Sequence, residues 1–313
     1  PFRIRVGVGY TLRAISAAVP WGQGAAALGA YMAGDAAGAR EFISRTADSR
    51  SRMRGEVAVL LGRPDLLSPE AAPATRARAA WARGDLGGAI AHLDGAGKGD
   101  FRYARRLRSE VQLLTPGYRL PVSPQNLGAA AKPAGTEPLR VLHVLTNSLP
   151  HTQSGYSLRT HRILTALRGR GIESVAVTRT GYPVMIGMPL AADDDVVDGI
   201  RYARTLPHRL PQTQEERLLA EVERALELVD EFRPHVIHAT TNYYNALVAQ
   251  AVSAATGLPW VLEVRGLMEK TWAASHPTPE GRSAAASSEK ARLVAVREAE
   301  LAASADAIVT LSQ

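Results

Sequence analysis

Residues 140–171, which read RVLHVLTNSLPHTQSGYSLRTHRILTALRGRG, decide the fold of this chain. Four of the first six residues are apolar, a pattern typical of a strand that is buried on both faces of a parallel sheet. Apolar residues then recur every three or four positions from Leu158 to Leu167, and Gly169 follows them, which predicts a helix and its C-terminal cap. The segment IESVAVTR at 172–179 predicts a second strand. The stretch is therefore a strand–loop–helix–strand unit of a parallel sheet.

The loop at 147–157, NSLPHTQSGYS, is the first candidate for a binding site. Ligands of open parallel sheets bind at the carboxyl ends of the strands, and this loop follows such an end. Gly155 allows a ligand to approach the backbone closely, and the helix that follows offers unpaired N–H groups to an anion. Further polar side chains come from His151, Gln153, Ser154 and Arg159. An ordinary polar connection is the alternative, because the loop matches neither the dinucleotide-binding nor the Walker glycine pattern.

The first third of the chain, residues 1–112, predicts an all-α domain of helical hairpins. AYMAGDAAGA at 30–39 and AWARGDLGGA at 80–89 share an aromatic residue, a Gly-Asp pair and a terminal alanine. Each copy predicts a helix, a tight turn and a second helix, and the pair resembles tetratricopeptide-like hairpins. Such an array is either an interaction surface or a packed cap that binds no partner.

The composition changes twice more along the chain. Residues 113–136 are rich in Pro, Gly and Ala and predict a linker. Residues 137–313 alternate apolar strand patterns with helical ones, which predicts an α/β domain with a Rossmann-like parallel sheet. The three adjacent aspartates at 193–195 have no further ligand at metal-binding spacing, so we expect no metal site there.

Charge and cysteine content limit the possible partners. Residues 1–112 carry 17 basic and 10 acidic side chains, whereas the remaining residues carry 20 of each. The basic excess of the first third reflects either composition alone or a face toward an anionic membrane. The arginine-rich segment at 101–110 lacks the surroundings of a nucleic-acid fold, so no nucleic acid is expected. Cysteine is absent, which excludes disulfides and is compatible with a reducing compartment. We therefore expect a cytoplasmic protein. A basic face toward lipid would make it peripheral on the inner face of the cell membrane.

Three segments taken in order resemble one family. They are VLHVLTNSLPHTQSGYSLRTHRILTALRGRGIESVAVTR at 141–179, RPHVIHATTNYYNALVAQAVSAATGLPWVLEVRGL at 233–267, and REAELAASADAIVTLSQ at 297–313. Together they resemble the amino-terminal half of family 4 glycosyltransferases of the GT-B fold. The resemblance covers residues 137–313, and it implies a bacterial cell-envelope or polysaccharide enzyme.

The resemblance implies a division of the site between donor and acceptor. Ser154, Gly155 and Tyr156 would contact the diphosphate of a nucleotide sugar. The acceptor side would be lined by His151, Gln153, Arg159, His238, Asn242, Tyr243, Gly266 and Glu269. The sugar nucleotide would be held mainly by a second domain, in the rest of the polypeptide or in a separate subunit, so we expect this chain alone to be inactive.

One position departs from the commonest family pattern. In that family a histidine usually precedes the glycine at the end of the strand predicted at 260–266, and here Arg265 occupies that place. Glu263 and Arg265 alternate with Val264, so they point to one face and can pair there. A guanidinium suits phosphate or carboxylate recognition better than proton transfer, which makes this pair the candidate catalytic pair. A purely structural ion pair is the alternative.

The resemblance implies a retaining transfer of a hexose-type sugar from a nucleotide diphosphate sugar to a polysaccharide or lipid-linked acceptor. The implied reaction uses no metal and no cofactor besides the nucleotide sugar as co-substrate. The alternative from another class is a non-catalytic module that binds glycan or protein and uses its helical domain as the interaction surface. A dinucleotide oxidoreductase fits poorly, because the glycine fingerprint and the ribose-binding acid are missing.

Overall fold

The computed structural model describes residues 23–45, 51–94, 97, 100–125 and 137–311. Contacts divide the chain into two compact units. The first comprises Pro1–Leu107 with Ser288–Lys290, and the second comprises Arg108–Ser287 with Ala291–Gln313. Within the described residues, no helix is both long and apolar enough to cross a lipid bilayer.

The first unit is helical. Its elements are α2 (Gln23–Ala33), α3 (Ala36–Ser44), α4 (Arg52–Leu60), the 3-10 turn η1 (Pro64–Leu66), α5 (Pro73–Ala82), α6 (Leu86–Ala91) and the start of α7 (Phe101–Leu114). Small side chains fill its two cores, one around Ala27, Ala30 and Ile43 and the other around Ala77, Ala80 and Leu107. Alanine lets neighbouring helices approach closely, so short helices can still bury a continuous apolar surface.

Both Gly-Asp pairs form the predicted hairpin turns. Gly34 adopts φ +87° between α2 and α3, a left-handed conformation that glycine adopts without strain. The next residue, Asp35, caps α3 by accepting a hydrogen bond from the Gly38 amide at 2.7 Å. Gly84 and Asp85 repeat this arrangement between α5 and α6. The helix–turn–helix prediction is confirmed at both copies, while the tetratricopeptide likeness stays a prediction.

The second unit is built on a seven-stranded sheet of order β3-β4-β2-β1-β5-β6-β7. Its strands are β1 (Arg140–Leu145), β2 (Glu173–Thr178), β3 (Asp194–Val197), β4 (Ile200–Ala203), β5 (Val236–Thr240), β6 (Trp260–Val264) and β7 (Ala307–Thr310). All neighbouring pairs are parallel except β3 with β4, which form a hairpin. The predicted α/β fold with a Rossmann-like parallel sheet is confirmed.

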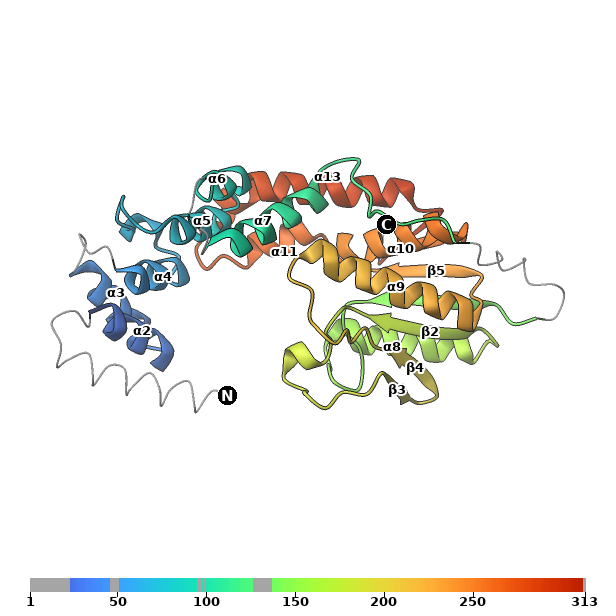
Figure 1. Ribbon diagram of the computed structural model, residues 1–313. Coiled ribbons are helices and arrows are strands. Elements are labelled where there is room, and N and C mark those ends of the chain that lie inside the picture. Colours follow the sequence, from blue (N-terminus) through green and yellow to red (C-terminus); the bar gives the residue numbers. More distant parts are fainter. Residues whose placement is uncertain (1–22, 46–50, 95–96, 98–99, 126–136, 312–313) are drawn as a thin grey trace. The chain divides into compact units, whose positions relative to one another are not determined.

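Helices cover the sheet of the second unit. They are α8 (Gly155–Arg168), α9 (Gln214–Phe232), α10 (Tyr243–Thr256), α11 (Met268–Ala274), α12 (Pro279–Ala286) and α13 (Glu289–Ser304), with the 3-10 turn η3 (Val184–Ile186). Helices α9 and α10 pack on each other and on the central strands, and α8 packs on β2 and β4 (Figure 1). Leu164 of α8 lies in a buried cluster with Leu145 of β1 and Tyr202 of β4. Helix α9 begins with a capping box, in which Thr213 and Glu216 are bonded to one another's backbone amides.

One segment differs from its sequence-based description. Residues 113–125, which composition marks as linker, belong to the second unit, where Leu113 and Leu120 are buried. Arg297 fixes this segment by donating from Nε to the Leu113 carbonyl at 3.0 Å. The polar stretch after β6 forms α11 and α12, and Glu298 accepts a hydrogen bond at 3.1 Å from the Met268 amide in the first turn of α11.

Candidate functional site

The candidate site lies where the strand order changes direction. The chain passes from β1 to β2 in one direction and from β5 to β6 in the other, so the loops after β1 and β5 diverge. A cavity of ≈ 170 Å³ lies at this end of the sheet, and we call it the polar cavity. Its lining includes Thr146, Asn147, Ser154, Tyr156, Asn242 and Arg265.

The start of helix α8 opens onto the polar cavity. Ser154 is the N-cap, and its hydroxyl accepts a hydrogen bond from the Ser157 amide at 3.2 Å. Gly155 begins the helix, and a Cβ at this position would meet nothing within 4 Å. The first-turn N–H groups of a helix have no intrahelical acceptor and favour an anion. The loop singled out in the sequence therefore offers exposed backbone donors beside a cavity.

Arg265 also lines the polar cavity and is held by three contacts. Its Nη2 donates to Glu263 Oε2 at 2.6 Å, and its Nη1 donates to Thr160 Oγ1 at 2.6 Å and to the Tyr156 carbonyl at 3.2 Å. Both members of the ion pair are buried, with side chains only 2% exposed. Arg265 Nε is buried and has no hydrogen-bond partner among the described residues. The guanidinium is thus fixed to α8, and three of its five N–H groups are used in these contacts.

Two histidines, the buried His143 and the half-buried His238, extend the network behind Glu263. His143 of β1 and His238 of β5 are register partners, and their Nδ1 atoms lie 2.9 Å apart. Burial, the neighbouring His238 and Arg265 hold the pKa of His143 well below its usual value. Burial also lowers the pKa of His238, against the attraction of Glu263, whose Oε2 lies 3.7 Å from His238 Nε2. With both rings neutral, one Nδ1–H donates to the other ring.

Glu263 stays ionised in this network. Burial by itself would raise its pKa, but the hydrogen bond and charge of Arg265 outweigh burial and hold the pKa of Glu263 below its usual value. Arg159 adds a second cation, with Nε 3.3 Å from Glu263 Oε1. The buried charges therefore form one compensated group, and Glu263 acts on the polar cavity through Arg265.

Thr241 connects β5 to α10 with a strained backbone. Its φ is +81°, a value at which a β-branched residue is a true outlier. The amide of Thr241 donates to the Glu263 carbonyl at 2.9 Å, which holds the turn against β6. Asn242 follows as the N-cap of α10, and its Nδ2 donates to Thr146 Oγ1 at 3.1 Å. Strain of this kind concentrates at binding sites.

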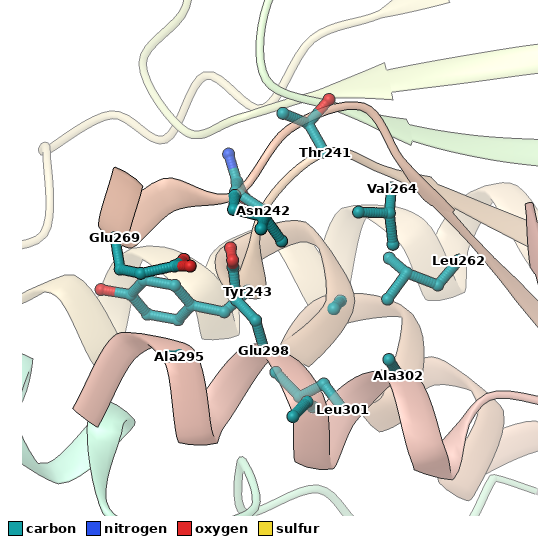
Figure 2. Close-up of a pocket in the computed structure, with 13 residues that line it drawn as sticks. Thr241, Asn242, Tyr243, Leu262, Val264, Glu269, Ala295, Glu298, Leu301 and Ala302 are labelled. Atoms are coloured by element: carbon teal, nitrogen blue, oxygen red, sulfur yellow. The ribbon is translucent and has the colours of Figure 1, made fainter. Parts of the chain in front are cut away.

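A second cavity of ≈ 170 Å³ lies behind the same strand ends, and we call it the apolar cavity (Figure 2). Leu262 and Val264 of β6 line it, whereas their neighbour Arg265 lines the polar cavity. Successive strand residues point to opposite faces, so the two cavities lie on opposite faces of the sheet. Thr241 and Asn242 border both cavities.

The residues that the sequence assigned to one site are distributed between the two cavities and their surroundings. The polar cavity brings together Ser154, Tyr156, Asn242 and Arg265, and Gly155, Glu263, Arg159 and His238 lie beside or behind it. Gly266 lies against Tyr156, because a Cβ there would approach the tyrosine hydroxyl to 3.3 Å. Tyr243 and Glu269 line the apolar cavity instead.

Five residues of the predicted acceptor group are absent from both cavity linings, namely His151, Gln153, Arg159, His238 and Gly266. His151 Nε2 lies 3.1 Å from Asp195 Oδ2, and that carboxylate also accepts a hydrogen bond at 2.6 Å from the buried Arg204. Gln153 is exposed. The aspartates at 194 and 195 are thus engaged with arginine and histidine side chains rather than grouped as free carboxylates.

His143, Thr146 and Thr160 contribute to the site, but sequence reasoning did not identify them. A histidine in the centre of a buried strand is the one available signal, because His143 interrupts an otherwise apolar run. Its contact with His238 depends on the register of β1 with β5, which joins residues 95 positions apart. Thr160 is identified only by its contact with Arg265 across two elements.

Comparison with known proteins places this geometry in a family. A family model described as "Glycosyl transferase 4-like domain" matches residues 154–313. The match begins at the N-cap of α8 and includes α10, β6 and the Glu263–Arg265 pair. No curated protein gives a significant match to the chain. The family match covers just over half of the chain, from the helix that opens onto the polar cavity to the last strand, so this protein belongs to the glycosyl transferase 4-like family.

Proposed function

We propose that the second unit is the acceptor-side half of a retaining, metal-independent glycosyltransferase of GT-B type. It would use a nucleotide diphosphate sugar and transfer the sugar to a polysaccharide or lipid-linked acceptor. The observation that supports this most directly is the polar cavity itself. An α-helix N-terminus and Arg265 face it, and no carboxylate lines it within the described chain. Such surroundings favour an anionic group over a divalent cation.

The chemistry assigned to the polar cavity is stabilisation of the diphosphate leaving group. Negative charge develops on that group as its bond to the sugar breaks, and fixed donors lower the free energy of such a transition state. The first-turn amides at Gly155 and Tyr156 and the Nε of Arg265 are the candidate donors. Glu263 is a positioning residue, because it holds the guanidinium of Arg265 and lies behind it.

Hydroxyl and amide side chains on the opposite rim suit a sugar acceptor. Thr146, Thr240 and Asn242 line the polar cavity where β1 and β5 end. These groups both donate and accept hydrogen bonds, as recognition of sugar hydroxyls requires. A donor-binding domain, in the rest of the polypeptide or as a separate subunit, would complete the reacting geometry and supply the proximity on which such catalysis depends.

The test is sugar transfer by the chain together with its donor-binding domain. A panel of radiolabelled nucleotide diphosphate sugars is supplied with bacterial polysaccharide and lipid-linked acceptors, with and without EDTA. We expect transfer from one donor class, unchanged by EDTA, with the anomeric configuration of the product retained by NMR. Loss of transfer in EDTA, or an inverted product, would contradict the corresponding part of the proposal.

Arg265→Lys tests the assigned donor. Lysine keeps the positive charge beside Glu263 but lacks the planar fork and the Nε, so we expect turnover to fall at least tenfold, about 1.4 kcal/mol. Arg233→Lys is the matched control, because Arg233 forms an exposed ion pair with Asp230 on α9, away from the polar cavity. Equal turnover of the Arg265→Lys and Arg233→Lys variants would show that Arg265 does not stabilise the transition state.

The second candidate function is a non-catalytic binding module. The paired helical hairpins of the first unit favour it, because such hairpins commonly present a partner-binding surface. This reading expects glycan or protein binding, but no transfer even when a donor-binding domain is supplied. Measuring transfer and glycan binding on the same preparation therefore separates the two functions.

Peripheral membrane association is a further part of the proposed setting. The basic excess of residues 1–112 motivates it, although Arg54 in that segment is buried and donates to the Ile43 carbonyl at 3.0 Å. Sedimentation with vesicles containing about one-third anionic lipid should retain the chain at low salt and release it at high salt. Binding that is indifferent to lipid charge and salt would contradict this part.

A further inference from the structure

The apolar cavity has aliphatic walls of a defined size. Leu262, Val264 and Leu267 close one side, and Leu301 and Ala302 of α13 close the other. Its volume of ≈ 170 Å³ slightly exceeds the roughly 150 Å³ at which a protein cavity lined by such side chains holds a benzene molecule. The walls therefore suit an apolar group of about one six-membered ring.

Two carboxylates stand at one end of this cavity. Glu269 comes from α11 and Glu298 from α13, and Figure 2 shows their carboxyl groups turned toward one another beside Tyr243. The Oε2 of Glu298 accepts a hydrogen bond from the Met268 amide at 3.1 Å. The other Glu298 oxygen, Oε1, and Glu269 Oε2 are both buried and have no hydrogen-bond partner among the described residues.

Nothing basic compensates these carboxylates from the cavity wall. Within the described residues, the lining contains no lysine, arginine or histidine. Tyr243 of α10 is the other titratable group at this end, and Glu110 of α7 and Arg297 of α13 act on it from outside the lining. Burial and the negative charge of Glu269 raise the pKa of Glu298 to about 7, although nearby backbone amides oppose the shift.

The two carboxylates and the aliphatic walls together decide which class of ligand the apolar cavity can bind. A divalent cation needs six or more oxygen ligands, or a cluster of protein ligands, and no group of three metal-binding side chains occurs in the described chain. An anion is repelled by the carboxylates. A free sugar would leave hydroxyls unsatisfied against aliphatic walls, which is costly. An ammonium group carries three donors and no acceptor, which complements two unpartnered carboxylate oxygens.

We propose that the apolar cavity is a binding site for a small organic cation, with an apolar body against Leu262, Val264 and Leu301 and an ammonium group between Glu269 and Glu298. This inference does not depend on the glycosyltransferase reaction, because it rests on a separate cavity. The cation places a positive charge between two like charges, which removes their repulsion and supplies the missing hydrogen bonds.

The test uses the full chain and three probes of nearly equal shape: benzylamine, benzyl alcohol and toluene. At pH 8, above the pKa of about 7 of Glu298, this carboxylate is ionised and the amine is protonated, so calorimetry should show benzylamine binding at least tenfold more tightly than benzyl alcohol, about 1.4 kcal/mol. This preference should shrink as the pH falls from 8 to 6 and Glu298 takes up a proton. Equal affinity of amine and alcohol at pH 8, or no binding of any probe, would overturn the proposal.

Substitution of each glutamate tests whether its carboxylate causes the preference for benzylamine over benzyl alcohol. Glu298→Gln and Glu269→Gln keep the side-chain shape, and each should reduce the amine-to-alcohol ratio several-fold while leaving toluene binding intact. Glu223→Gln, on the exposed face of α9, is the matched control and should leave all three affinities unchanged. Toluene also reports that the cavity of each variant has folded. A variant that binds toluene and keeps the full amine preference would contradict the assignment.

Discussion

The two cavities share the ends of β5 and β6 but differ in almost every chemical property. The polar cavity presents amides, hydroxyls and Arg265, and none of the described residues that line it is a carboxylate, whereas the apolar cavity presents aliphatic walls and two glutamates. The alternation of β6 produces this contrast, because Leu262 and Val264 face one way and Glu263 and Arg265 the other. One strand therefore supports sites of opposite charge, and each site can be altered separately.

The largest expected effect comes from breaking the ion pair on the polar side. Arg265→Met leaves Glu263 as a buried carboxylate without its main partner, which should lower the free energy of unfolding by about 3–5 kcal/mol. Combining it with Glu263→Leu should restore most of that loss, because a buried apolar pair replaces a buried ionic one. Urea unfolding of both variants measures the difference. A double variant that stays as unstable as the single one would show that the contacts of Glu263 with Arg159 and His238 also stabilise the fold.

The pH dependence of stability should have opposite signs on the two sides. Glu298 has a raised pKa, so the fold retains a proton that the unfolded chain has lost, and its contribution fades as the pH rises from about 4.5 to about 7. His143 has a lowered pKa, so the unfolded chain takes up a proton first and stability is lost as the pH falls below about 6.5.

Two neutral variants separate these contributions. Glu298→Gln should remove the loss of stability on raising the pH through 5–7, and His143→Leu should remove the loss on lowering it below 6.5. Each changes the slope of unfolding free energy against pH by at most about 1.4 kcal/mol per pH unit. Urea midpoints at half-unit pH intervals measure both slopes. Slopes that change in the same direction would show that the two faces are not electrostatically separate.

Smaller effects follow from the two helix caps. Asn242→Ala and Ser154→Ala each remove an N-cap acceptor and should lower the free energy of unfolding by about 1 kcal/mol. Their effects on binding should differ, because Asn242 borders both cavities and Ser154 only the polar one. Benzylamine affinity should therefore change in Asn242→Ala and stay constant in Ser154→Ala. A changed benzylamine affinity in Ser154→Ala, with an unchanged affinity in Asn242→Ala, would contradict the position of Asn242 at the boundary of both cavities.

The smallest expected change in stability is at Gly155. A Cβ at this position has open space and α8 gains a better helix former, so Gly155→Ala should raise the free energy of unfolding by about 0.5–1 kcal/mol. The same methyl group would stand where an anion approaches the helix, so pyrophosphate affinity should fall. Thermal unfolding and a pyrophosphate titration are measured on one preparation. Unchanged pyrophosphate affinity would show that the anion does not bind at the N-terminus of α8.

Local patterns in the sequence were sufficient to predict the fold. The strand and helix of residues 140–171, the two Gly-Asp turns and the capping box of α9 each depend on contacts within a few residues. Such features follow from backbone chemistry that the residue types themselves determine.

The arrangement of the site depended on contacts that the sequence does not contain. Tyr243 and Asn242 are neighbours, yet only Tyr243 turns wholly toward the apolar cavity, because the helix begins between them. Glu269 meets Glu298 across 29 positions, and His143 meets His238 across 95. Periodicity predicts which face of its own element a residue occupies, but not which residue of another element lies opposite.

The backbone of Thr241 has a consequence for engineering the protein. A left-handed threonine costs on the order of 1–3 kcal/mol, so Thr241→Gly should give a more heat-resistant chain. Because Thr241 borders both cavities, that gain would loosen one part of the boundary between them. Selection for thermal resistance alone would favour this substitution, and a library screened for both heat resistance and ligand discrimination would show whether the two properties conflict at this single position.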